Sequence, residues 1–160
     1  VQVLEQQLRN TKWQGVYNVN DDSFTTELQL VVVQDGYVGG EIIHSESSET
    51  GGGYLHTRVA GDIVIQFQIN GAFIDEDALS ADTLASLSLD TPTRYIVRIK
   101  RVRGLQVVND ADGSSWSQNR EYRLTLQNNT LVGTVVIPND SYGEGDKTSE
   151  NGSIALALVP

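Results

Sequence analysis

Most of the basic side chains of this sequence lie close together: seven of the eleven Lys and Arg residues fall between positions 94 and 123. Two segments with alternating apolar residues, TRYIVRIKRVRGLQVVN and SWSQNREYRLTLQ, flank the turn-forming residues 110–113, which predicts a β-hairpin. With that turn, four cross-strand pairs follow: Val97–Leu126, Ile99–Leu124, Arg101–Tyr122 and Arg103–Arg120.

The last two pairs continue the face of the apolar ones, which we expect to point inward. Guanidinium groups beside a phenol at the end of an apolar cavity suit a ligand carboxylate, because arginine donates in a bidentate fashion. Arg101, Arg103, Arg120 and Tyr122 are therefore the candidate ligand-binding residues. The alternative is that the hairpin extends past the barrel and its arginines are solvated or paired with nearby acids, Glu121, Asp110 and Asp112.

Two weaker patterns could hold a metal ion. His44 and His56 are the only histidines, and a symmetric hairpin around the Ser/Gly-rich turn between them would set them opposite one another. Glu41 or Glu46 would then have to complete the site, and the default is that both histidines are exposed on their strands.

The second pattern is acidic. Asp75 and Asp77, within the run Asp75-Glu76-Asp77, supply oxygen ligands of the kind that Ca²⁺ prefers, as does the segment Asp110-x-Asp112-Gly113. Neither has the spacing of a calcium-binding loop, and aspartates also occur in turns because they bond the local backbone. No cofactor is expected. We find no nucleophile elbow, phosphate-binding glycine loop or zinc-protease motif, so the sequence does not predict an enzyme.

The elements that must position these residues are strands. From Phe24 to Val32 the residues alternate with a period of two, as in a strand with one buried face, and the Asp35-Gly36 pair that follows is typical of a tight hairpin. Gly39-Gly40 suggests a bulge or a sharp barrel bend in the next strand. A three-residue loop at 60–62 would set Val59 opposite Ile63, which predicts four consecutive strands up to Asn70.

The remaining segments complete one predicted domain, residues 1–160. Residues 1–11 form an arm or short helix covering a barrel end, and 71–91 form a helical or loop insertion, with a helix capped near Asp77. Asn128-Asn129 marks a further turn. The fold class is all-β, an antiparallel meander β-barrel of about eight or nine strands with one short helix. A β-sandwich is the alternative.

Composition narrows the function. The net charge of −10 argues against nucleic acid as a partner, because phosphate binding needs positive charge. No apolar run approaches the roughly 20 residues of a membrane-spanning helix, so no membrane insertion is expected. The absence of Cys excludes disulfides and cysteine catalysis. Met is also absent, even at position 1, which suggests a chain that is either trimmed or processed, as a secreted protein or lipoprotein would be. We expect a secreted, periplasmic or cell-surface location.

The segment Trp13-Gln14-Gly15-Val16-Tyr17 resembles the first strand of small calycin barrels, the superfamily of lipocalins, fatty-acid-binding proteins and avidins. In that superfamily a Trp and a Gly near the first strand close one end of the barrel, so the resemblance implies that Trp13 is buried at a barrel end. The residues VAGD at 59–62 and the closing LVG and GSIALAL segments resemble bacterial lipocalin-like domains. Lipocalins usually read Gly-x-Trp, whereas this chain reads Trp13-x-Gly15. Avidins carry several ligand-stacking tryptophans, and this chain has only Trp13 and Trp116, which disfavours biotin.

The spacing Arg120-x-Tyr122 is similar to the carboxylate-binding Arg-x-Tyr of fatty-acid-binding proteins. The resemblance implies a barrel that binds a small apolar or amphipathic molecule, with a carboxylate at those two residues. The competing hypothesis is a structural β-domain that binds another protein through a strand edge or the Arg-rich hairpin.

Overall fold

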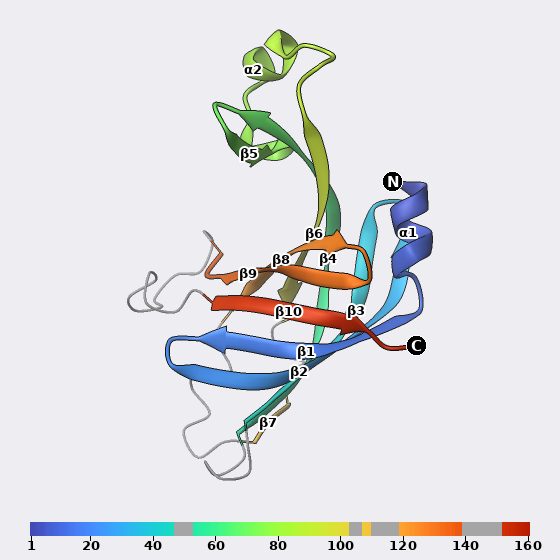
Figure 1. Cartoon of the computed structure of the whole chain (residues 1–160), viewed down its shortest axis with the longest axis vertical. Coiled ribbons are helices and arrows are strands. Elements are labelled where there is room, and N and C mark those ends of the chain that lie inside the picture. The colour runs from blue at the N-terminus through green and yellow to red at the C-terminus, as the bar shows by residue number, and fades with distance from the viewer. Residues whose placement is uncertain (47–52, 103–106, 110–118, 139–151) are drawn as a thin grey trace.

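The computed structural model describes residues 1–46, 53–102, 107–109, 119–138 and 152–160, with the backbone alone for 107–109. Eight antiparallel strands form a closed barrel in the order β3-β2-β1-β10-β9-β8-β6-β4, and β3 pairs with β4 to complete the circle (Figure 1). The bounds are β1 Thr11–Val19, β2 Asp22–Gln34, β3 Tyr37–Ser45, β4 Tyr54–Ile69, β6 Thr93–Arg101, β8 Glu121–Gln127, β9 Thr130–Val136 and β10 Gly152–Leu158. The closed barrel confirms the predicted fold class, and the β-sandwich is not adopted.

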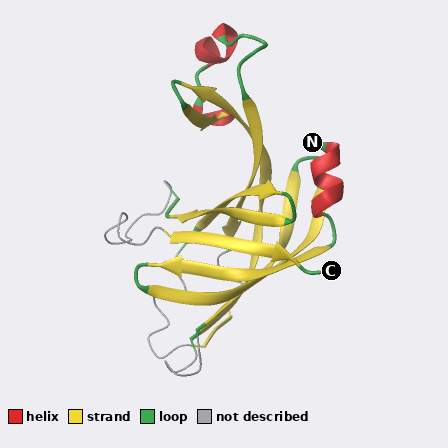
Figure 2. Ribbon diagram, viewed as in Figure 1, coloured by secondary structure: helices red, strands yellow, loops and turns green. Residues whose placement is uncertain are grey.

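The other elements attach to this barrel (Figure 2). Two short strands, β5 (Ala72–Asp75) and β7 (Val107–Asn109), both pair with β4. The helices are α1 (Gln2–Leu8), the 3-10 turn η2 (Glu76–Ala78) and α2 (Ala81–Ser86). The end of β4, β5, η2, α2 and the start of β6 extend away from the barrel, and we call residues 63–96 the projection (Figure 1).

Helix α1 covers one end of the barrel, here called the helix end. The Glu5 carboxylate accepts a hydrogen bond of 2.8 Å from the Gly36 amide, and Arg9 Nε donates to the Val33 carbonyl. Leu8 is fully buried, and Trp13 is 1% exposed, which confirms the predicted burial of this tryptophan at a barrel end. At the opposite end, here called the far end, β3 finishes at Ser45 and β6 at Arg101.

The predicted turn at 60–62 is wrong, because β4 runs without interruption from Tyr54 to Ile69. β4 pairs through 59–62 without a register shift, so its odd-numbered residues lie on one face throughout, although the buried residues change from Leu55, Thr57 and Val59 to Val64 and Gln66. β3 pairs along β4 as far as Asp62 on one side, and β6 pairs with β4 from Val59 to Phe67 on the other. The segment therefore contributes one strand where two were predicted.

The tight turns follow the residues that tolerate a left-handed backbone. Asp35 and Gly36 have φ of 53° and 82° and join β2 to β3, which confirms the predicted hairpin. Asn128 has φ of 57° in the predicted turn between β8 and β9. Asn70-Gly71 makes an equivalent turn between β4 and β5 that the sequence interpretation missed. The bulge lies in β2, where the register shifts between Leu30 and Val32, and not at the facing Gly39-Gly40 as predicted.

We expect Gly36→Ala to lower the free energy of unfolding by about 1–2 kcal/mol, because an L-residue at a positive φ is strained. Gly39→Ala is the control, since its new methyl group would meet only the movable ring and hydroxyl of Tyr37. Its cost should be smaller. Urea denaturation of the two variants measures the difference, and equal losses would mean that the turn geometry does not matter.

The insertion at 71–91 contains a short helix as predicted, but that helix is not capped near Asp77. The chain first pairs with β4 as β5 and then forms η2. Helix α2 begins after Ser80, whose hydroxyl oxygen accepts a hydrogen bond from the Thr83 amide at 3.2 Å. Asp77 does not cap a helix because its carboxylate binds Arg98 instead. A serine oxygen is as good a helix cap as an aspartate, and here it decides where the helix begins.

The predicted hairpin between β6 and β8 exists, but its register differs by two residues. Val97 pairs with Leu124 and Ile99 with Tyr122. The prediction assumed that the whole segment up to Asn109 belongs to the hairpin, whereas residues 107–109 pair with β4. A shift of two residues keeps every side chain on its face, so the inward-facing set is unchanged.

Candidate functional site

The inward face of the barrel carries polar side chains near the far end, within an otherwise apolar core. We call them the inner polar cluster. They come from β2, β3, β6, the start of β8 and the residue before it, and each is at most 5% exposed: Thr26, His44, Arg101, Tyr122 and Arg120. Buried polar groups need hydrogen-bond partners, so their contacts define what the cluster can do.

Hydrogen bonds connect four of these side chains in a row. Arg101 Nε donates to the Tyr122 hydroxyl at 2.8 Å, and His44 Nε2 lies 2.8 Å from the same hydroxyl. On the other side of the imidazole, Nδ1 lies 2.8 Å from Thr26 Oγ1. Arg120 joins through the backbone, because its carbonyl accepts from the Arg101 amide at 3.3 Å.

The electrostatics keep both titratable members of this row neutral at neutral pH. Burial, followed by the positive charge of Arg101, holds the pKa of His44 well below its usual value. Burial raises the pKa of Tyr122, and the charges of Arg101 and Arg120 together with the hydrogen bond from Arg101 oppose that rise. The positive charges of Arg101 and Arg120 therefore act on the buried Tyr122 hydroxyl inside the barrel.

Aromatic rings surround the imidazole. The Tyr17 ring lies 4.9 Å from the His44 ring between centroids, and the Tyr122 ring stacks on it at 5.8 Å with 22° between the planes. Phe24 extends this surface, 5.7 Å from Tyr17. The cluster thus combines guanidinium donors with an aromatic surface, a combination suited to an anionic head group on an apolar body.

The structure brings together three of the four residues predicted to bind a ligand. Arg101, Arg120 and Tyr122 point inward as expected, although Arg101 is not directly opposite Tyr122. Arg103 lies outside the described residues, as do Asp110 and Asp112 of the second acidic segment. Arg101 and Arg120 are buried and therefore not solvated, while the alternative in which they pair with Asp110 and Asp112 falls on residues outside the described ranges.

The predicted pairing of the two histidines is wrong by one residue. Ile43 pairs with His56 and His44 with Leu55, so the two imidazoles lie on opposite faces of the sheet and cannot share a metal ion. His44 is fully buried, not exposed, while His56 Nε2 lies 3.6 Å from Glu41 Oε1 on the outer face. The pairing of Ser45 with Tyr54 sets this register, and composition alone cannot reveal it.

Thr26 and His44 are the members of the cluster that the sequence interpretation missed as site residues. A signal was present, because both follow the alternation of their strands. His44 shares its parity with the buried Val38 and Ile42, and Thr26 lies between the buried Phe24 and Leu28.

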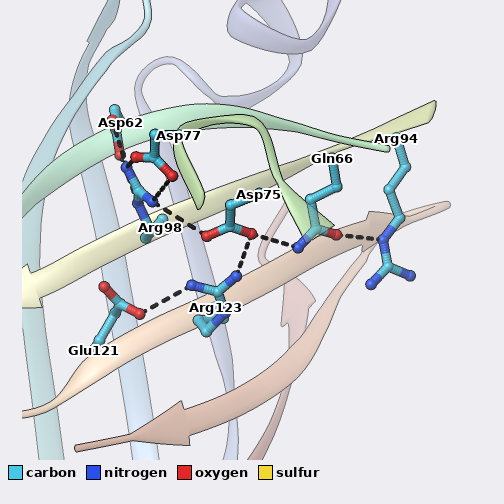
Figure 3. Close-up of polar contacts among 8 residues, drawn as sticks. All are labelled: Asp62, Gln66, Asp75, Asp77, Arg94, Arg98, Glu121 and Arg123. Carbon is cyan, nitrogen blue, oxygen red and sulfur yellow. Dashed lines mark hydrogen bonds and ion pairs between the residues drawn. The ribbon is translucent and has the colours of Figure 1, made fainter. Parts of the chain in front are cut away.

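The acidic run at 75–77 belongs to a different network on the outer face, which joins the projection to the barrel wall. Figure 3 shows Asp75 at its centre. Arg123 reaches one Asp75 oxygen at 2.5 Å, and Arg98 reaches the other at 3.2 Å. Gln66 also donates to Asp75 and in turn accepts from Arg94, both at 2.7 Å.

Arg98 is the second centre of this outer network (Figure 3). Its guanidinium forms two hydrogen bonds to Asp62 and two to Asp77, the shortest at 2.7 Å. Burial raises the pKa of Asp75, but hydrogen bonds from Arg123 and Gln66 and the nearby positive charges lower it overall. The hydrogen bond from Arg98 lowers the pKa of Asp77. In the structure the carboxylates of both calcium candidates, Asp75 and Asp77, bind arginine side chains.

The described ranges contain no group of three or more His, Cys, Asp or Glu side chains placed to hold a metal ion. Their helices are all too short or too polar to cross a membrane.

Comparison with known proteins finds no family model and no curated protein that matches this chain. The candidate site is therefore defined by its own geometry.

Proposed function

We propose that this protein binds a small amphipathic molecule with a carboxylate head group, and that the inner polar cluster receives the head. The observation that carries the proposal is the pair of buried arginines, Arg101 and Arg120, on the inward face of a barrel with an apolar core. A carboxylate matches a guanidinium in shape and charge, and the bond strengthens where water is excluded.

The arrangement also suits the rest of such a ligand. Tyr17, Phe24 and Tyr122 supply an aromatic surface next to the arginines, against which an alkyl or aryl body can pack. The resemblance to calycin barrels supports the same function. The composition supports a secreted, periplasmic or cell-surface location, including that of a processed lipoprotein.

The test is a set of calorimetric titrations with dodecanoate and dodecanol, which share the alkyl chain and differ in charge. Arg120→Ala should weaken dodecanoate binding by about ten- to a hundredfold, the range expected for losing a charge-assisted hydrogen bond. Dodecanol should bind with nearly unchanged affinity, because its apolar contacts remain. Lys100→Ala is the matched control, since Lys100 points outward beside Arg101 and its loss should change neither affinity.

Each failure has a distinct meaning. If the wild type binds neither ligand saturably, the ligand-binding function is wrong. If both ligands bind and Arg120→Ala changes neither affinity, the barrel still takes an apolar ligand but the carboxylate site is wrong.

A second candidate function, a protein-interaction module, is favoured by the projection. Among the described strands β5 pairs with β4 alone, so its other edge can accept a strand from a partner protein. Leu89 is fully exposed and Tyr95 is 38% exposed on the same projection. Absence of saturable binding in the titrations above would favour this candidate.

A further inference from the structure

The donor and acceptor of each hydrogen bond in the row inside the barrel can be assigned by starting from Arg101 at one end. A guanidinium has only donors, so the Tyr122 oxygen must accept from Arg101 Nε. The single hydrogen of the Tyr122 hydroxyl can then point to His44 Nε2, 2.8 Å away. This makes Nε2 an acceptor and places the imidazole proton on Nδ1.

The same order continues to the other end of the row. The proton on His44 Nδ1 donates to Thr26 Oγ1, and the Thr26 hydroxyl donates to the Phe24 carbonyl at 3.3 Å. In this arrangement the Tyr122 hydroxyl, the imidazole N–H of His44 and the Thr26 hydroxyl each have an acceptor. The opposite tautomer would turn the Tyr122 hydrogen away from His44 and the Thr26 hydrogen away from Phe24. The geometry therefore favours the Nδ1–H form of a neutral His44.

The row links opposite walls of the barrel. Thr26 and His44 are cross-strand partners on β2 and β3, whereas Arg101 and Tyr122 belong to β6 and β8. The imidazole also contacts the rings of Tyr17 and Tyr122. His44 therefore has a fixed position and a fixed orientation relative to the Tyr122 hydroxyl.

We propose that His44 is the positioning residue of the ligand site: it takes the Tyr122 hydroxyl hydrogen, so that the Tyr122 oxygen holds Arg101 in place for the ligand carboxylate. The inference rests on the proposed ligand-binding function. It changes the role of Tyr122, whose hydrogen is used within the protein. The head group is then recognised by its negative charge at the arginines, so the site prefers anions over neutral esters of the same length.

Two variants separate this role from a purely structural one. His44→Gln keeps an amide oxygen that can accept from Tyr122, whereas His44→Leu has a similar size and no acceptor. We expect His44→Leu to weaken dodecanoate binding by about tenfold and His44→Gln by no more than about threefold, since one oriented hydrogen bond is at stake. Neither should change the affinity for dodecanol. Methyl dodecanoate should bind the wild type no more tightly than dodecanol does.

The imidazole itself gives a readout that does not depend on any ligand. In ¹⁵N-labelled wild-type protein, nitrogen–proton correlation spectra should assign the proton of His44 to Nδ1, with Nε2 unprotonated. His56 lies on the outer face and serves as the reference resonance.

The outcomes distinguish the two proposals. A proton on Nε2, or equal dodecanoate affinities for the two His44 variants and the wild type, overturns the role of His44 while the ligand-binding function stands. If the wild type binds neither dodecanoate nor dodecanol, both proposals are overturned, whatever the tautomer. Loss of binding in His44→Leu with rescue in His44→Gln, together with the Nδ1–H tautomer, supports the role of His44.

Discussion

Replacing Trp13 with alanine is expected to lower the free energy of unfolding by about 3–5 kcal/mol, the usual cost of truncating a large buried aromatic residue. Trp13 is 1% exposed at the helix end of the barrel, where it pairs with Leu28 across β1 and β2. Its indole Nε1 donates to Thr11 Oγ1 at 2.8 Å. The truncation leaves a cavity and removes the indole N–H that donates to Thr11. The closed barrel cannot easily collapse to fill the cavity or supply another donor.

Tyr95→Ala is the control for this result. It also removes a large aromatic side chain, but Tyr95 is 38% exposed on the projection, so the loss should be below about 1 kcal/mol. Guanidinium chloride denaturation followed by circular dichroism compares the two variants with the wild type. An unchanged midpoint for Trp13→Ala would show that this tryptophan does not close the barrel, and would remove the main support for the calycin resemblance.

Gly61→Ala is expected to cost about 3 kcal/mol or more, because the new methyl group has no space. An ideal Cβ at Gly61 would overlap the Arg98 carbonyl oxygen and lie 2.8 Å from the Ile99 Cα, both in the backbone of β6. Backbone cannot rotate away as a side chain can. Accommodating the methyl group therefore requires β4 and β6 to separate at a point where both belong to the barrel wall.

The measurement is the same denaturation experiment, together with the fraction of soluble protein after expression. Gly39→Ala again serves as the control, because its methyl group meets the Tyr37 side chain and not a strand backbone. Wild-type stability in Gly61→Ala would show that β4 and β6 do not approach each other as closely at this glycine as the structure indicates.

The parts of the fold that local patterns determine were predicted from the sequence. Alternation and turn chemistry indicated a barrel, the hairpin at Asp35-Gly36 and the turn at Asn128. The turn at 60–62 was predicted wrongly because a three-residue loop preserves the same parity as a continuous strand. Only the pairing of β4 with β3 and β6 at once distinguishes the two, and that pairing is not a local property.

The candidate site was predicted in part for a similar reason. Arg101, Arg120 and Tyr122 were assigned to the inward face correctly, because an error of two residues in register does not change the face. An error of one residue does change the face. For this reason His44 and His56, which were predicted to lie opposite one another, lie on opposite faces of the sheet. That His44 contacts Tyr122, which is 78 residues away in the chain, depends on barrel closure and could not be inferred from either strand alone.

The pairing of β1 with β10 bears on how this barrel forms during synthesis. The ribosome delivers β1 early, but one of its two hydrogen-bonding edges has no native partner until residues 152–158 have emerged. Until then both β1 and β9 present open backbone edges, which are templates for incorrect pairing with other chains. Closure also joins segments from nearly opposite ends of the chain, which favours slow folding. Completion of the native barrel is thus a late event that depends on its last strand.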